Sequence, residues 1–166
     1  GQKWTYPKHN EEFLKKIIKE LYLHPVIAQV LVSRGFQSVQ EIRDFLYPQF
    51  PSLHPASSFL DMEKAVARLL KSKENNEHVM IYGDGDVDGI TGVTLLVEFL
   101  QMLGVKTSYC CSGTLFKQHG EITSLISQML QDGVSLLITV DCGITAGREV
   151  RSINKQGIDV IVTDHH

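Results

Sequence analysis

Carboxylate and imidazole side chains are concentrated in three short segments of the second half of this chain. The segments are 82–89 (YGDGDVDG), 139–143 (TVDCG) and 163–166 (TDHH). None of them contains a lysine or an arginine that could neutralise the carboxylates. Because crowded like charges repel one another, bound divalent cations are a simple source of compensating charge.

Each segment directly follows an apolar run that is typical of a buried strand, at 79–82, 136–140 and 159–163. A further run at 105–110 and helical patterns near 91–103, 121–131 and 146–155 complete an alternation of strands and helices. Strands that are apolar on both faces predict an α/β fold, in which a parallel sheet carries helices on both faces. Ligands of such sheets bind beyond the carboxyl ends of the strands, so we expect the three segments to meet at one edge.

The types of side chain indicate which cations could bind. Carboxylate oxygens alone favour Mg²⁺ or Ca²⁺, and added imidazole nitrogens shift the preference toward Mn²⁺ and other transition metals. Several aspartates could hold two ions about 3.5–4 Å apart, an arrangement that suits the hydrolysis of phosphoesters.

Four other interpretations of segment 84–89 fit less well. An EF-hand loop requires a preceding helix and a glutamate at its twelfth position, where this chain has Leu95. A haloacid-dehalogenase phosphatase would use Asp86 as nucleophile and Asp88 as acid–base, but it lacks a later histidine pair. A phospho-receiver domain does not contain Asp-His-His either, and the GxGxxG motif of a dinucleotide-binding fold is absent.

The first 76 residues are predicted to form a small helical region. Apolar residues have helical spacing at 13–21 and 26–31, Ser38 and Glu41 match a capping box, and Asp61 is expected to cap a further helix. We therefore expect a helical N-terminal region at 1–76 and an α/β domain at 77–166. No helix follows the last strand to cover it, so we expect the sheet to be incomplete and the domain to be truncated at His166.

Composition excludes several classes of protein. The chain has 166 residues, of which 43% are hydrophobic and 21% are charged, so it is neither disordered nor fibrous. No apolar run approaches the roughly 20 residues of a membrane span, so we expect no membrane association. Three cysteines do not make a paired disulfide framework, and a cytoplasmic location is expected.

The motifs IYGDGDVDGITG, ITVDCGI and VIVTDHH together resemble the first three motifs of the DHH phosphoesterase superfamily. Within it they are similar to the RecJ-like exonucleases, and the resemblance extends from about residue 26 to residue 166. It implies four metal ligands, which are Asp86, Asp88, Asp141 and His165. It also implies that His166 faces the scissile phosphate, that Asp84 is a further catalytic acid beside the ions, and that Asp164 orients an imidazole.

The resemblance implies a metal-dependent phosphodiesterase that degrades single-stranded DNA from 5′ to 3′ in repair or recombination, using two Mn²⁺ or Mg²⁺ ions. It implies a monomer with single-stranded DNA, and single-strand-binding protein, as partners. The part of the domain that is present is expected to be inactive alone. Two departures concern Tyr82, where many relatives have a histidine, and the segment 110–121, which differs from the usual pattern.

Two alternatives stay open at the level of sequence. One is a hydrolase of small phosphoesters, such as oligoribonucleotides, cyclic dinucleotides or pyrophosphate. The other is a catalytically silent binding module with the same fold. The helical region before residue 77 favours the exonuclease over the small-substrate enzymes, which often begin near the core of the domain.

Overall fold

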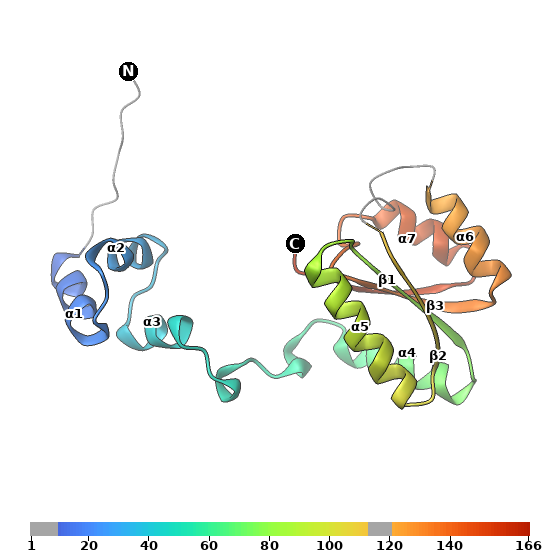
Figure 1. Ribbon diagram of the computed structural model, residues 1–166, viewed down its shortest axis with the longest axis horizontal. Coiled ribbons are helices and arrows are strands. Elements are labelled where there is room, and N and C mark those ends of the chain that lie inside the picture. Colours follow the sequence, from blue (N-terminus) through green and yellow to red (C-terminus); the bar gives the residue numbers. More distant parts are fainter. Residues whose placement is uncertain (1–9, 113–120) are drawn as a thin grey trace, which may run out of the picture. The chain divides into compact units, whose positions relative to one another are not determined.

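The chain is described here by a computed structural model that covers residues 10–112 and 121–166 (Figure 1). It divides into two compact units, Gly1–Ser58 and Phe59–His166. None of the helices in the described part combines the length and the apolar character that a transmembrane helix requires.

The first unit is a small helical bundle. It contains α1 (Glu11–Leu21), α2 (Pro25–Ser33) and α3 (Val39–Leu46), followed by the 3₁₀ turns η1 (Phe50–Ser52) and η2 (Ala56–Ser58). Its core consists of the buried residues Ile17, Leu21, Ala28, Leu31 and Ile42. The predicted capping box is confirmed, since the Ser38 hydroxyl accepts the Glu41 N–H at 3.1 Å while the Glu41 carboxylate accepts the Ser38 N–H.

The second unit is an α/β domain, as the sequence predicts. Its elements are α4 (Met62–Glu74), β1 (His78–Gly83), α5 (Val87–Met102), β2 (Lys106–Cys111), α6 (Glu121–Gln131), β3 (Val134–Val140), α7 (Gly147–Asn154) and β4 (Asp159–Thr163). All strand pairs are parallel, and the order in the sheet is β2-β1-β3-β4. The last paired residues of β3 and β4 are Val140 and Thr163.

Helices cover both faces of the sheet, with α4 and α5 on one side and α6 and α7 on the other (Figure 1). A hydrophobic core lies on each face of the sheet. Successive residues of β1 pack into the two cores in alternation, because successive side chains of a strand point to opposite faces. The core beneath α5 contains Val79, Ile81, Val93, Val97, Leu100, Val105, Leu136 and Ile138. The core beneath α6 and α7 contains Met80, Tyr82, Leu125, Met129, Val134, Leu137, Ile153 and Ile158.

Helix α4 packs with the sheet, although the sequence pattern grouped it with the helical region that ends at residue 76. The compact unit that contains the sheet begins at Phe59, and Leu69 packs against the core beneath α5. Arg68 of α4 contacts Asp159 through Nε at 2.6 Å and Glu77 through Nη1 at 2.8 Å. Its Nη2 donates to the carbonyl oxygen of Ser135 at 3.3 Å, so one guanidinium joins α4 to β3 and β4.

Arg68→Met is expected to lower the free energy of unfolding by about 2 kcal/mol, because it leaves the mostly buried Glu77 carboxylate without its cation. Urea unfolding of the chain measures this effect. Lys64→Met is the matched control, since the ion pair of Lys64 with Asp61 is exposed and should contribute nothing measurable. Equal stability of wild type and Arg68→Met would contradict the anchoring role of Arg68.

Glu77 gives this contact a dependence on pH. Burial alone would raise its pKa, but hydrogen bonds from Arg68 and Asn75 hold the pKa of the Glu77 carboxyl below its usual value. A carboxyl whose pKa is lower in the folded state stabilises that state above its unfolded pKa, and the contribution disappears as the pH falls through the folded pKa. We expect Glu77→Gln to be less stable than wild type at pH 7, and the difference to shrink below about pH 4. Urea unfolding at both pH values measures it, and a difference that grows toward low pH would contradict the assignment.

Two helix starts differ from the sequence prediction. Helix α5 begins at Val87 instead of Thr91. Asp86 is its N-cap, so residues 87–90 form the first turn of the helix. Asp61 does not cap α4 through its side chain. It adopts a left-handed conformation with φ of 59°, and its carboxylate pairs instead with Lys64.

Candidate metal centre

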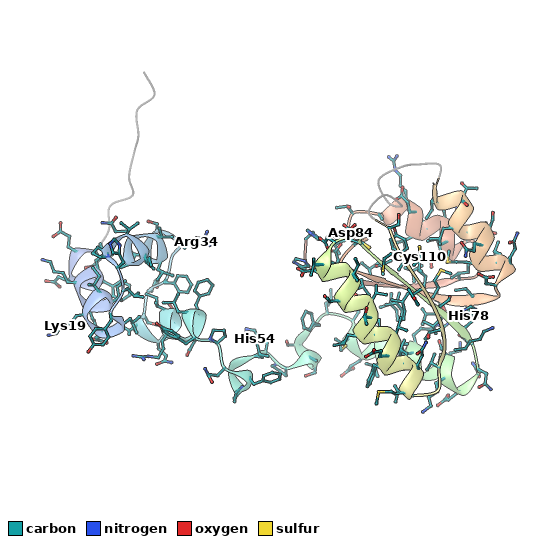
Figure 2. The ribbon with its side chains drawn as sticks, in the orientation of Figure 1. Lys19, Arg34, His54, His78, Asp84 and Cys110 are labelled. Carbon is teal, nitrogen blue, oxygen red and sulfur yellow. The ribbon has the colours of Figure 1, made fainter. Side chains whose placement is uncertain are left out.

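The sheet has a reversal of strand order between β1 and β3, because β2 lies to one side of β1 while β3 and β4 lie to the other. The crevice beyond the carboxyl ends of strands at such a reversal is the usual ligand site of an open parallel sheet. Segments 82–89, 139–143 and 163–166 all leave the sheet at this edge. Figure 1 shows the C-terminal end of the chain beside the start of α5, and Figure 2 places Asp84 and His78 at opposite ends of β1.

The turn from β1 into α5 is held by close backbone contacts and a cap. A Cβ atom on Gly89 would lie 2.8 Å from the backbone N and C atoms of Asp84, so only glycine fits there. The Asp86 carboxylate accepts the Gly89 N–H at 3.0 Å, and this bond holds the pKa of Asp86 below its usual range. The Asp141 carboxyl and His166 also lower the pKa of Asp86.

Asp141 follows β3 in a left-handed conformation with φ of 63°, which aspartate tolerates better than most residues. Its side chain is only 7% exposed, and its Oδ1 lies 2.8 Å from Nε2 of His165. The alignment of that contact is not that of a hydrogen bond, and Oδ1 has no hydrogen-bond partner in the described part of the chain. A buried carboxylate oxygen without a donor is costly, and a cation would satisfy it.

Asp164 links the turn after β3 to the histidine pair. Its buried carboxylate accepts the Ile144 N–H at 2.9 Å through Oδ2 and contacts Nδ1 of His166 at 2.7 Å through Oδ1. Burial alone would raise its pKa, but these bonds and two further backbone donors lower the pKa of Asp164 to about 2. The same contact raises the pKa of His166 and, in the neutral ring, places the proton on Nδ1, so that Nε2 remains available to a ligand.

Three of the predicted residues form one group of possible ligands. Donor atoms of Asp141, His165 and His166 all lie within 4.8 Å of one another. The rings of His165 and His166 are adjacent, with centroids 4.5 Å apart. Carboxylate oxygen together with imidazole nitrogen suits Mn²⁺ or a similar divalent ion, and the unsatisfied Oδ1 of Asp141 agrees with such an occupant.

The other two acidic residues after β1 differ in their positions. Asp84 is half-buried and accepts the Gly85 N–H at 2.7 Å, and its charge contributes to the raised pKa of His166. Asp88 is exposed in the first turn of α5. No contact within residues 10–112 and 121–166 joins the Asp88 side chain to Asp141 or the histidines, so its role as a ligand stays a prediction.

Sequence reasoning missed Ile144, since a backbone N–H donor leaves no signature in residue types. Tyr82 is packed in the core, as expected from its place at the end of a strand, and its hydroxyl donates to the Ser112 carbonyl at 2.6 Å, a contact that the sequence does not reveal. Burial and the charges of three aspartates raise the pKa of the Cys142 thiol to about 12, so this thiol is protonated at neutral pH in the metal-free chain. Of the segment 110–121, which departs from the family pattern, residues 113–120 lie outside the described residues.

Comparison with known proteins adds three findings. The family model described as "DHH family, N-terminal domain" matches residues 78–166. The single-stranded-DNA-specific exonuclease RecJ of Bacillus subtilis (strain 168) is 30% identical over 164 residues, which cover 99% of this chain and 21% of that protein. This chain thus spans about a fifth of the length of the curated relatives that it matches.

Two solved structures share the fold. RecJ from Thermus thermophilus in complex with Mn²⁺ aligns with a TM-score of 0.62 at 27% identity, over 98% of this chain and 22% of that one. A structure of exonuclease RecJ bound to manganese aligns with a TM-score of 0.58 at 29% identity, over 69% of this chain and 29% of that one. Both similar proteins carry the metal for which the donor set described above is suited.

Proposed function

This chain belongs to the DHH family, and we propose that it supplies the metal-binding residues of an exonuclease that degrades single-stranded DNA. The observation that carries the proposal is the buried Oδ1 of Asp141, which has no hydrogen-bond partner in the described residues and lies beside His165. The similarity to RecJ proteins supports the substrate class, since those relatives are named as single-stranded-DNA-specific exonucleases. Digestion from the 5′ end and a role in DNA repair or recombination are part of the same proposal.

Asp86, Asp141 and His165 would hold a divalent cation, Mn²⁺ or Mg²⁺, and Asp88 completes the proposed set. A pair of such cations would supply the Lewis acidity that hydrolysis of a phosphodiester requires. Asp141 follows β3, which lies between β1 and β4, and its Oδ1 is 2.8 Å from Nε2 of His165; as the resemblance to the DHH superfamily implies, it would be shared by the two ions.

His166 and Asp164 would act on the substrate side of the centre. Asp164 fixes the imidazole of His166 through Nδ1, so its Nε2 points away from Asp164 and can face a phosphate oxygen. Because Asp164 raises the pKa of His166, the ring carries a proton over a wider range of pH and can stabilise negative charge on the phosphoryl oxygens. Asp84 adds negative charge that favours the cations.

The first test is direct binding of Mn²⁺ to this chain, measured through the electron paramagnetic resonance signal of the free ion. We expect saturable binding that EDTA reverses. Absence of binding would overturn the proposal at its base, whatever the nuclease assays show.

The second test replaces the matching segment of the Bacillus subtilis relative with this chain. With Mn²⁺ we expect the chimera to release nucleotides from the 5′ end of single-stranded DNA and to leave blunt duplex intact. We propose that this chain alone shows no sustained turnover, because it spans about a fifth of its relatives. Hydrolysis only of oligoribonucleotides, cyclic dinucleotides or pyrophosphate would assign a small-substrate hydrolase instead. A folded chimera that binds Mn²⁺ and cleaves none of these would indicate a binding module.

A further inference from the structure

We propose that Thr163 is a positioning residue of the metal centre, whose hydroxyl fixes the end of β4 against the end of β3. In this way it sets the distance between Asp141 and the two histidines. The inference rests on the proposed function, because it concerns the same cation site.

Thr163 contacts β3 on both sides of Val140, its partner in the strand register. Its Oγ1 donates to the carbonyl oxygen of Thr139 at 2.6 Å. Its own carbonyl oxygen accepts the Asp141 N–H at 2.8 Å. Thr163 is therefore joined to the end of β3 by one side-chain hydrogen bond and one backbone hydrogen bond. We call this pair of hydrogen bonds the Thr163 latch.

The latch lies where the regular sheet ends. The ladder between β3 and β4 runs from Leu136 opposite Asp159 to Val140 opposite Thr163 and stops there. In the described sheet β4 pairs with β3. Asp141 follows Val140 by one residue, and His165 follows Thr163 by two. A displacement of the end of β4 relative to the end of β3 would therefore change the distance between these two ligands.

The side-chain bond adds to the backbone bond at the last pair of the ladder. Asp141 has a left-handed backbone, and the chain changes direction immediately after that pair. Without the Thr163 hydroxyl, only backbone bonds hold this end of β4 to β3. Metal sites require their ligands to be positioned within about 0.5 Å, and residues that orient ligands commonly contribute about 10-fold to 100-fold to metal affinity.

Thr163→Val tests the hydroxyl alone, because valine has nearly the same shape and the same preference for strands. Thr163→Ser should restore the bond. Thr94→Val is the matched control, since Thr94 also donates its hydroxyl to a backbone carbonyl, that of Ile90 at 2.8 Å, on the exposed surface of α5. Two measurements are made on each chain: Mn²⁺ affinity by electron paramagnetic resonance, and hydrogen exchange of the Asp141 amide without metal.

We expect Thr163→Val to weaken Mn²⁺ binding about 10-fold and to speed exchange of the Asp141 amide by a similar factor. Thr163→Ser should stay within about 2-fold of wild type, and Thr94→Val should change neither quantity. The inference is overturned if Thr163→Val binds Mn²⁺ like wild type, or if Thr163→Ser or Thr94→Val shows the same loss. A wild-type chain that binds no Mn²⁺ would instead overturn the proposed function, so the two failures are distinguishable.

Discussion

Replacement of Asp141 with asparagine is expected to weaken Mn²⁺ binding by at least about 100-fold. Residues that merely orient ligands contribute about 10-fold to 100-fold, so loss of a ligand should exceed that range. Asparagine keeps the size of the side chain but removes its charge, and Asp141 is the buried carboxylate whose Oδ1 lies 2.8 Å from Nε2 of His165. In the chimera with the Bacillus subtilis relative, the same substitution should reduce nuclease activity to background.

The same substitution should not destabilise the metal-free chain. The Oδ1 atom of Asp141 has no hydrogen-bond partner among the described residues, and asparagine keeps an oxygen that can occupy the same place beside Nε2 of His165. We therefore expect the melting temperature in EDTA to stay unchanged or to rise, and that of wild type alone to increase when Mn²⁺ is added. The substitution should thus leave the metal-free chain as stable as before or more stable, and should remove the stabilisation by Mn²⁺. This combination is expected of a residue that binds a cation, and not of one that only stabilises the fold.

Asp132→Asn is the control for Asp141→Asn. Asp132 is exposed directly after α6, and its contacts among the described residues are those of its backbone, whose N–H donates to the Gln128 carbonyl and whose carbonyl contacts His78. It should change neither Mn²⁺ affinity nor stability. If Asp141→Asn binds Mn²⁺ as well as Asp132→Asn does, Asp141 is not a ligand, and if it unfolds the chain in EDTA, the prediction that the carboxylate does not stabilise the metal-free fold is wrong.

The sequence predicts the sheet well because its central strands β1 and β3 are mostly buried on both faces. Runs such as 136–140 and 159–163 are mainly apolar, and turns rich in glycine and aspartate bound them. The class of fold, the parallel direction and the edge at which Asp141 and His165 meet all follow from that pattern. The capping box of α3 was also predictable, since its contacts are only three residues apart.

Contacts between distant residues were not predictable. Arg68 reads as an exposed cation of an amphipathic helix, yet it joins α4 to Asp159, 91 residues away. The cap at Asp61 failed for a related reason, because a left-handed backbone and an ion pair replaced the expected side-chain bond. Residue types show that a cap or an ion pair is possible, and packing decides which of them forms.

In the candidate site, too, residue types predict the ligands but not the contacts that position them. Motifs identified Asp141, His165 and His166, which the structure brings within 4.8 Å of one another. They could not identify the donors that hold the ligands, such as the Ile144 N–H and the Thr163 hydroxyl. Ligands are specified by side-chain chemistry, whereas their orientation is specified largely by the backbone of neighbouring strands.

Gly89→Ala is expected to destabilise the chain by about 3 kcal/mol, although it introduces a better helix former into α5. In an unconstrained helix, alanine in place of glycine adds up to about 1 kcal/mol of stability. Here the new Cβ would lie 2.8 Å from the backbone N and C atoms of Asp84, and closest of all to its carbonyl oxygen. The backbone of Asp84 cannot easily move away from the new methyl group, because its N–H is hydrogen-bonded to the Val140 carbonyl at 3.3 Å.

Two further glycines make a graded series with Gly89. A Cβ on Gly92 would meet a methyl group of Val140 at 2.7 Å, so Gly92→Ala should cost about 1 kcal/mol as that side chain shifts. A Cβ on Gly147, the first residue of α7, would meet only the flexible end of Arg151 at 3.5 Å. Gly147→Ala should therefore be neutral or add up to about 1 kcal/mol.

Urea unfolding in EDTA and Mn²⁺ affinity together decide whether the clash at Gly89 concerns the site. The turn that the new methyl group would displace carries Asp84 and Asp86, so Gly89→Ala should lose Mn²⁺ binding even where the chain remains folded. Gly92→Ala should keep most of the affinity and Gly147→Ala all of it. If Gly89→Ala were as stable as Gly147→Ala and bound Mn²⁺ equally well, the tight turn between β1 and α5 would not be what positions these carboxylates.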